Sequence, residues 1–319
     1  MLNTVLVTGG CGYTGTLLTR QLLSAGHQVT VFDTQWFGNH LEAHPFLKVV
    51  KGNIRNVDSI PLDGIETVFH LANIANDPAV DLEPTLSWEV NVLAAMQMAD
   101  QCVRKGVKQF VFASSGSVYG LKDEDRVTED LELVPISVYN KTKMVAERVL
   151  LSYADKMQVL CVRPATVCGY SPRMRLDVAV NMLTFQALKN KRITVFGGDQ
   201  TRPNIHIEDL VDVYMHLLAN PQIASGCYNA GFENITILEI ANRVTEIIPA
   251  EVVVSESNDP RSYRLDSSKL LATGFKPKRS VGQAIREMIE LYQKGILTDN
   301  EKSHTVKWMQ QLIKTGGLV

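Results

Sequence analysis

Residues 4–26 read TVLVTGGCGYTGTLLTRQLLSAG, and this stretch decides the fold. It begins with a short apolar run, Thr4 to Val7, which is typical of a buried strand. Three glycines follow at three-residue spacing, and a helix-like segment then runs from about residue 13 to a stop signal at Gly26. A strand that turns through glycines into a helix brings backbone amides and the positive end of the helix dipole together. The stretch therefore predicts a site for a dinucleotide diphosphate.

Strand-like and helix-like segments continue to alternate beyond this stretch. Further strands are expected at Gln28 to Phe32, Lys48 to Val50, Thr67 to Leu71, Gln109 to Ala113 and Gln158 to Val162. Helices are expected at about residues 13–25, 84–105 and 137–156. This order predicts an α/β fold with a doubly wound parallel Rossmann sheet.

The alternation becomes less regular after Arg163-Pro164. Helices are expected near residues 176–190 and 207–219, with a turn at Gly197-Gly198-Asp199 between them. We therefore expect a dinucleotide-binding domain over residues 1–168. Residues 169–319 should form mainly a smaller mixed α/β lobe for the substrate, and part of 201–230 is expected to return to the first domain.

Composition excludes several classes of partner. The chain has 32 basic and 34 acidic side chains and no basic stripe with interleaved aromatics, so no nucleic acid partner is expected. No stretch reaches the roughly 18 apolar residues of a membrane span, and the first residues lack a basic leader, so we expect a cytoplasmic protein without a membrane partner. The five scattered cysteines show no C-x-x-C spacing and fit reduced core thiols.

The candidate cofactor-binding residues start with the glycine turn and its neighbour: Gly9, Gly12, Tyr13 and Gly15. Asp33 ends the second expected strand, where a carboxylate can accept hydrogen bonds from ribose hydroxyls and repel a 2′-phosphate. The sequence therefore favours NAD over NADP, although Asp33 could merely end a strand. Asn53 follows the third strand and is placed either to bind an adenine edge or to form a simple turn.

Tyr139 and Lys143 lie four residues apart in a segment with helical apolar spacing, so their side chains share one helix face. Free tyrosine has a pKa near 10, but a unit positive charge about 4 Å away, at an effective dielectric of about 20, is worth about 4 kcal/mol or three pKa units. The pair is a candidate proton-transfer group. Upstream, the run Ala113 to Ser117 brings hydroxyls to the carboxyl edge of the sheet, where open α/β sheets bind ligands.

Four segments together resemble extended short-chain dehydrogenases that act on nucleotide sugars, the group of UDP-galactose 4-epimerase: TGGCGYTG, FVFASSGSVYG, VYNKTK and GGDQTRPNIHIEDL. The resemblance covers most of the chain. It implies that Tyr139 is the acid/base and that Lys143 binds the nicotinamide ribose and lowers the pKa of the tyrosine. It also implies that Ser115 hydrogen-bonds the reacting sugar oxygen, with Ser117 as a weaker candidate.

The resemblance also implies that Arg202 and Arg261 hold the substrate diphosphate, because a planar guanidinium pairs with phosphate oxygens through two hydrogen bonds. Without it, both would be read as surface arginines. A homodimer is the expected assembly, because the family pairs helices equivalent to 84–105 and 137–156 across a two-fold axis.

Three positions depart from the family pattern. Sugar-nucleotide 4,6-dehydratases carry Thr-Asp-Glu where this chain has Ser115-Gly116-Ser117, so the carboxyls that would eliminate water are missing. An asparagine found after the sixth strand of epimerases is Thr166 here, which leaves the substrate contacts of that loop open. Residues 171–181, SPRMRLDVAVN, resemble a branch that includes enzymes oxidising C4 of GDP-heptoses, and by that analogy Asn181 faces the nucleotide base.

The sequence thus predicts an NAD-dependent nucleotide-sugar 4-epimerase whose partner is a nucleotide-diphosphate sugar. A net C4 dehydrogenase or 4-ketosugar reductase would use the same residues. A non-catalytic NAD-sensing regulator is an alternative from another class, since fold alone does not guarantee activity. His40 and His44 lie four residues apart, but no third metal ligand is evident, and no metal is expected.

Overall fold

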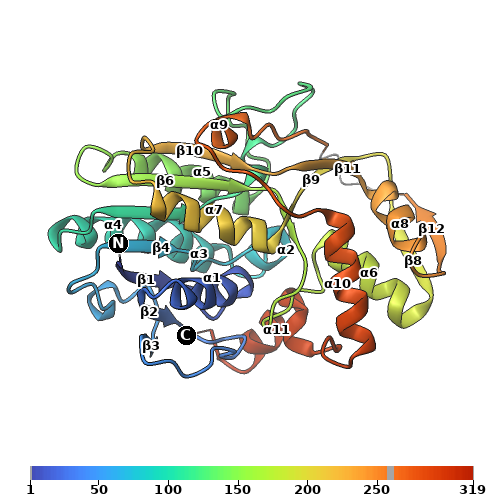
Figure 1. The fold of residues 1–319 in the computed structure, drawn as a ribbon, viewed down its shortest axis with the longest axis horizontal. Helices are drawn as coiled ribbons and strands as arrows, with labels where there is room; N and C mark the ends of the chain where they lie inside the picture. Colours follow the sequence, from blue (N-terminus) through green and yellow to red (C-terminus); the bar gives the residue numbers. More distant parts are fainter. Residues whose placement is uncertain (1, 257–261, 319) are drawn as a thin grey trace.

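A computed structural model describes residues 2–256 and 262–318 of the chain. A seven-stranded parallel sheet forms its centre, with the strand order β10-β6-β5-β4-β1-β2-β3 (Figure 1). The strands of this sheet are β1 (Thr4–Thr8), β2 (Gln28–Asp33), β3 (Leu47–Lys51), β4 (Thr67–His70), β5 (Gln109–Ala113), β6 (Gln158–Pro164) and β10 (Gly226–Ala230). The order reverses between β1 and β4, as in a doubly wound sheet, so the expected Rossmann fold is confirmed.

Helices cover both faces of this sheet. They are α1 (Tyr13–Ser24), α7 (Ile207–Ala219), α3 (Pro84–Trp88), α4 (Ala94–Arg104) and α5 (Val138–Leu151). Side chains alternate along β1: Val5 and Val7 belong to the core under α1 and α7, while Leu6 belongs to the core under α4 and α5. Both faces of the central strands are buried, which explains why their sequences are mostly apolar, while the edge strand β3 is partly exposed.

The helix expected at 84–105 is not continuous. A π-helical turn, η2 (Glu89–Leu93), lies between α3 and α4 and carries Asn91 into the protein interior. Asn91 accepts a hydrogen bond from Ile74 N (2.8 Å) and donates one to Thr142 Oγ1 (3.1 Å). The widened turn thus fixes the loop after β4 against α5. The sequence prediction missed it because the apolar spacing on either side remains helical.

The second lobe is smaller and has mixed strand directions. Its elements are α6 (Ala179–Asn190), α8 (Ile237–Thr245), α10 (Val281–Gln293), a parallel pair β8 (Arg192–Phe196) and β12 (Glu251–Ser255), and a three-stranded sheet of β7 (Thr166–Cys168), β9 (Thr201–His206) and β11 (Glu233–Thr236). The short helices α2 (Asp77–Val80) and α9 (Ser268–Leu271) lie in connections. Later parts of the chain return to the first domain: α7 and β10 complete its helix layer and sheet, α9 packs against β10 with Leu270 in the core, and α11 (Thr305–Lys314) places Met309 in the core on the other face.

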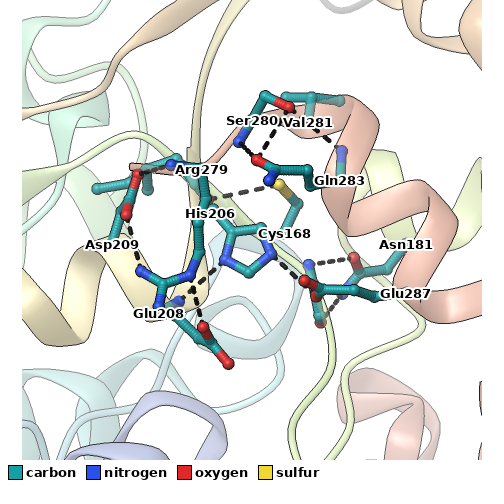
Figure 2. Close-up of polar contacts among 12 residues, drawn as sticks. Cys168, Asn181, His206, Glu208, Asp209, Arg279, Ser280, Val281, Gln283 and Glu287 are labelled. Carbon is teal, nitrogen blue, oxygen red and sulfur yellow. Dashed lines mark hydrogen bonds and ion pairs between the residues drawn. The ribbon is translucent and has the colours of Figure 1, made fainter. Parts of the chain in front are cut away.

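A polar network fixes α10 to α7 at the junction of the lobes (Figure 2). His206 caps α7 by accepting a hydrogen bond from Glu208 N through Nδ1, and its Nε2 contacts Glu287 of α10 at 3.1 Å. Arg279, just before α10, pairs with buried Asp209 at 3.1 Å. This network holds β9, which ends at His206, in a fixed position relative to the sheet.

The five cysteines are buried and unbridged in the structure, in line with the expected core positions. Among residues 2–256 and 262–318, no helix is long and apolar enough to cross a membrane. Within the same ranges, no three His, Cys, Asp or Glu side chains gather in a way that could hold a metal ion.

Candidate functional site

A cavity of about 750 Å³ lies at the carboxyl ends of the parallel strands and is lined by both lobes. Its floor includes the ends of β1, β2, β5 and β6, and its outer wall comes from β7, β9 and the segment that precedes α6. Open α/β sheets bind ligands at this edge, next to the point where the strand order reverses.

The glycine turn between β1 and α1 lines one end of the cavity. Gly9 has a φ of +73°, and a Cβ there would lie 2.6 Å from Ala72 N, so only glycine fits. A Cβ at Gly15 would lie 2.2 Å from Gly9 O, so this glycine allows α1 to start against the turn. Gly12 caps α1 without a side-chain hydrogen bond to its first amides. This cradle of backbone amides fits the diphosphate of a dinucleotide.

Asp33 and Asn53 line the same part of the cavity. Asp33 ends β2, and its carboxylate accepts hydrogen bonds from Cys11 N (3.0 Å) and Gln35 N (2.6 Å), which fix its orientation. Burial raises the pKa of Asp33. Asn53 Oδ1 accepts a hydrogen bond from Arg55 N (3.1 Å), so this side chain forms a turn while also facing the cavity.

The two serines after β5 form a short hydroxyl chain at the cavity wall. Ser115 Oγ lies 2.7 Å from Ser117 Oγ, and Ser117 Oγ donates to Asn140 Oδ1 at 2.6 Å. Asn140 is held in turn by the N-cap residue of α5, because the backbone N–H of Asn140 donates a hydrogen bond to Ser137 Oγ. The serine positions are therefore fixed by the first turn of the helix that also carries Tyr139.

Tyr139 faces the cavity, and Lys143 lies one helical turn further, fully buried behind it. Lys143 Nζ lies 5.9 Å from the Tyr139 ring centroid and donates a hydrogen bond to Ala113 O at 2.7 Å. The structure thus brings the pair and Ser115 together at the ends of β5 and α5.

The electrostatics of the pair differ from the simple expectation. Burial raises the pKa of Tyr139 to about 12, although a hydrogen bond with Ser115 lowers it in part. Burial also lowers the pKa of Lys143 to about 7, against the attraction of Glu147. Desolvation opposes the charged form of each group, so the protein alone holds Tyr139 as a phenol at neutral pH.

The remaining predicted substrate residues lie in different places. Thr166 on β7 and Arg202 on β9 line the cavity. Asn181 lies behind the wall: its side chain donates to Tyr13 Oη (3.0 Å) and Arg175 O (2.9 Å) and accepts from Gly169 N (2.9 Å). Its contacts fix the loop between β7 and α6. Arg261 lies outside the described residues.

Several lining residues were missed at the sequence level. They are Asp77, Arg173, Arg175, Asp177, Thr305, Val306 and Met309. Arg173 and Arg175 lie at alternate positions of the SPRMRLD segment, at the start of the expected substrate lobe. Two arginines so close together at this boundary are a sequence signal for an anion site that could have identified them. The residues of α11 carry no such signal, because an apolar stripe on a terminal helix is typical of ordinary packing.

The model of the NAD dependent epimerase/dehydratase family matches residues 5–231. The chain belongs to this family. NAD is accordingly its cofactor, and the glycine turn described above provides the cradle that such a cofactor requires. The expected family is confirmed.

Similar proteins carry out more than one reaction. The UDP-glucose 4-epimerase of Lactobacillus helveticus is 30% identical over 308 residues, covering 86% of this chain and 92% of that protein. UDP-glucuronic acid decarboxylase 1 of Arabidopsis thaliana is 28% identical over 93% of this chain and 71% of its own length. The structure of MoeE5 in complex with UDP-glucuronic acid and NAD superposes with a TM-score of 0.81 at 27% identity, covering 92% of this chain and 99% of that one.

Asp33 is expected to set the choice between NAD and NADP. Because two backbone amides hold its carboxylate at the cavity wall, we expect it to repel a 2′-phosphate and to accept hydrogen bonds from ribose hydroxyls. We expect NAD to bind more than about tenfold more tightly than NADP, because a tenfold difference in Kd corresponds to only about 1.4 kcal/mol of binding free energy. In Asp33→Ser the gap should narrow. Calorimetry with both cofactors checks this, and equal affinities in the wild type would contradict it.

Proposed function

We propose that this protein is an NAD-dependent nucleotide-sugar 4-epimerase that works through a transient 4-keto sugar. The observation that carries the proposal is that Ser115 and Tyr139 face the same cavity as the glycine turn. A proton-transfer group and a dinucleotide cradle are therefore available to one substrate. Family membership and the 30% identity to a UDP-glucose 4-epimerase support the class of reaction.

The residues divide the work as follows. NAD, when bound, supplies the oxidising and then the reducing power at C4 of the sugar. Ser115 hydrogen-bonds the oxygen on C4 and orients it toward Tyr139. The Tyr139 phenolate accepts the hydroxyl proton during oxidation and returns it during reduction. Lys143 holds the nicotinamide ribose and provides the positive charge that offsets the cost of a buried phenolate.

The cavity also favours a substrate held by a diphosphate. Arg202 lines the wall that belongs to the second lobe, opposite the face of the first domain. A guanidinium there is suited to phosphate oxygens, as the resemblance implies. Because both lobes line one cavity, cofactor and sugar can be kept together while the keto sugar turns over, which epimerisation requires.

Two alternative functions differ from this proposal in what happens to the nucleotide sugar. A net C4 dehydrogenase or 4-ketosugar reductase would use the same Ser115, Tyr139 and Lys143, and the SPRMRLD segment favours it. Dehydration is disfavoured, because Gly116 and Ser117 stand where dehydratases carry carboxyls. A non-catalytic regulator would bind NAD yet turn over no nucleotide sugar.

The test is the fate of a label at C4. We expect C4-deuterated UDP-glucose, or another nucleotide sugar from a panel that the enzyme accepts, to give a C4-inverted product that retains deuterium. Absorbance should show no stoichiometric NADH, and the reaction should need no added oxidant. A 4-keto product that has lost the label would establish the dehydrogenase instead, while inertness toward the whole panel would favour the regulator.

We also propose a homodimer formed through the helices at 84–105 and 137–156. In the segment from α3 to α4, Trp88, Leu93 and Met96 are 38%, 46% and 37% exposed, which is high for large apolar side chains. We expect sedimentation at micromolar concentration to give twice the mass of 35.4 kDa. Leu93→Glu should shift the equilibrium to the monomer, and a wild-type protein that sediments only as the monomer would contradict the proposal.

A further inference from the structure

Arg173 is a buried cation at the wall of the cavity. It is only 6% exposed, yet within residues 2–256 and 262–318 it has no carboxylate partner in an ion pair. Its Nε has no hydrogen-bond partner there, and its two terminal nitrogens make only long contacts, to Met174 O (3.5 Å) and Thr305 Oγ1 (3.4 Å). Burying a charged group with its donors unsatisfied is costly, so the position calls for an anion.

The neighbouring arginine shows the contrast. Arg175 also lines the cavity, but it forms two hydrogen bonds with Asp177, Nε to Oδ1 at 3.0 Å and Nη2 to Oδ2 at 3.1 Å. The positive charge of Arg175 is therefore neutralised by the Asp177 carboxylate within the protein. The same extended segment therefore brings one neutralised and one unneutralised guanidinium to the cavity.

Two segments that are distant in the sequence hold the Arg173 guanidinium in place. Its Cζ lies 3.9 Å from the ring centroid of Phe37, which follows β2, and its Nη2 contacts Thr305 at the start of α11. A hydrogen bond from Trp308 Nε1 to Trp36 O (2.6 Å) fixes α11 against the same loop. The group is thus pre-organised, so a ligand would not have to order it.

The surroundings of Arg173 locate it relative to the cofactor. Asp33, at the end of β2, and Tyr13, at the start of α1, line the same cavity as Arg173, and both act on its charge. Burial lowers the pKa of Arg173 to about 9, so the group still carries its charge at neutral pH. The ribose site at Asp33 and the amide cradle at Tyr13 flank the position where a dinucleotide diphosphate lies on such a turn.

We propose that Arg173 is a cofactor-binding residue whose guanidinium binds the diphosphate of NAD from the side opposite the glycine turn. The backbone amides of the turn and the α1 dipole then neutralise one side of the diphosphate, and the second lobe supplies a full charge for the other. The proposal concerns the cofactor and holds whether the reaction is epimerisation or net oxidation.

The test is the binding of NAD and of two of its fragments, ADP-ribose and adenosine, to the wild type and to Arg173→Met. Methionine keeps an apolar side chain over Phe37 but removes the charge. We expect calorimetry to show about 10- to 100-fold weaker binding of NAD and of ADP-ribose, since charge-assisted hydrogen bonds are the strong ones. Adenosine, which lacks phosphate, should bind both proteins alike. Arg173→Lys should give an intermediate loss, because it keeps the charge without the planar fork.

Stability without cofactor separates this role from a structural one. Arg173→Met should unfold at the same urea concentration as the wild type or at a higher one, because it removes a desolvated charge. Two outcomes would overturn the proposal: an equal loss for adenosine and ADP-ribose, or unchanged ADP-ribose binding in a folded variant. A clear loss of stability without cofactor would also overturn it and assign Arg173 to packing.

Discussion

Tyr139→Phe is expected to keep NAD binding and to lower turnover by at least about 100-fold. The variant retains the ring at the cavity wall but loses the oxygen that we propose accepts and returns the sugar proton, and a positioned proton-transfer group contributes about 10²–10⁴-fold. Calorimetry with NAD measures the first quantity, and steady-state rates with the best nucleotide sugar measure the second.

A second tyrosine close to the end of the same helix provides a matched control. Tyr153, just after α5, is partly exposed and does not line the cavity, so Tyr153→Phe should retain near-normal turnover. Turnover of Tyr139→Phe within a few-fold of the wild type would remove Tyr139 from the proton-transfer role. Loss of NAD binding in this variant would mean that the ring mainly shapes the cofactor site.

The features that the sequence predicts well are local or periodic ones. The glycine turn follows from consecutive residues, because Gly9 and Gly15 sit where no Cβ fits. The spacing of Tyr139 and Lys143 follows from the helical period. Six strands of the large sheet are short, mostly apolar runs, and their predicted limits differ from the observed ones by no more than two residues, whereas β10 was not predicted as a strand.

The features that escaped prediction depend on contacts between distant segments. Arg173 meets Phe37 and Thr305, which lie 136 and 132 residues away in the chain, and no local pattern marks such a meeting. The same holds for the π-helical turn at Asn91, whose partners belong to a loop and to α5.

Electrostatic properties were predicted least well, for the same reason. The expected effect of Lys143 on Tyr139 considers two charges at a set distance, but the pKa of each group is governed first by burial. Burial is a property of the packed molecule. Glu147, one helical turn after Lys143 on α5, forms a buried ion pair with Arg163 of β6 at 2.7 Å, and the two-charge expectation left out this carboxylate and its partner.

Lys143→Met is expected to abolish most activity and, in the cofactor-free protein, to raise stability at neutral pH. Burial lowers the pKa of Lys143 from 10.5 to about 7, so the charged side chain is less stable in the folded protein than in the unfolded chain. Because the pKa of Lys143 is lower in the folded protein, the charged lysine reduces the free energy of unfolding by its full amount below about pH 7. This loss of stability becomes smaller as the pH rises and disappears near pH 10.5. The variant has no such cost.

Two measurements check this prediction. We expect urea unfolding between pH 6.5 and 9.5 to show that the free energy of unfolding of the wild type increases relative to that of the variant by up to about 1.4 kcal/mol per pH unit. The residual turnover of the variant should have its pH optimum shifted upward, because Tyr139 loses the cation that favours its phenolate. A stability difference that does not change with pH would show that Lys143 is not desolvated, and an unmoved optimum would separate it from Tyr139 in the reaction.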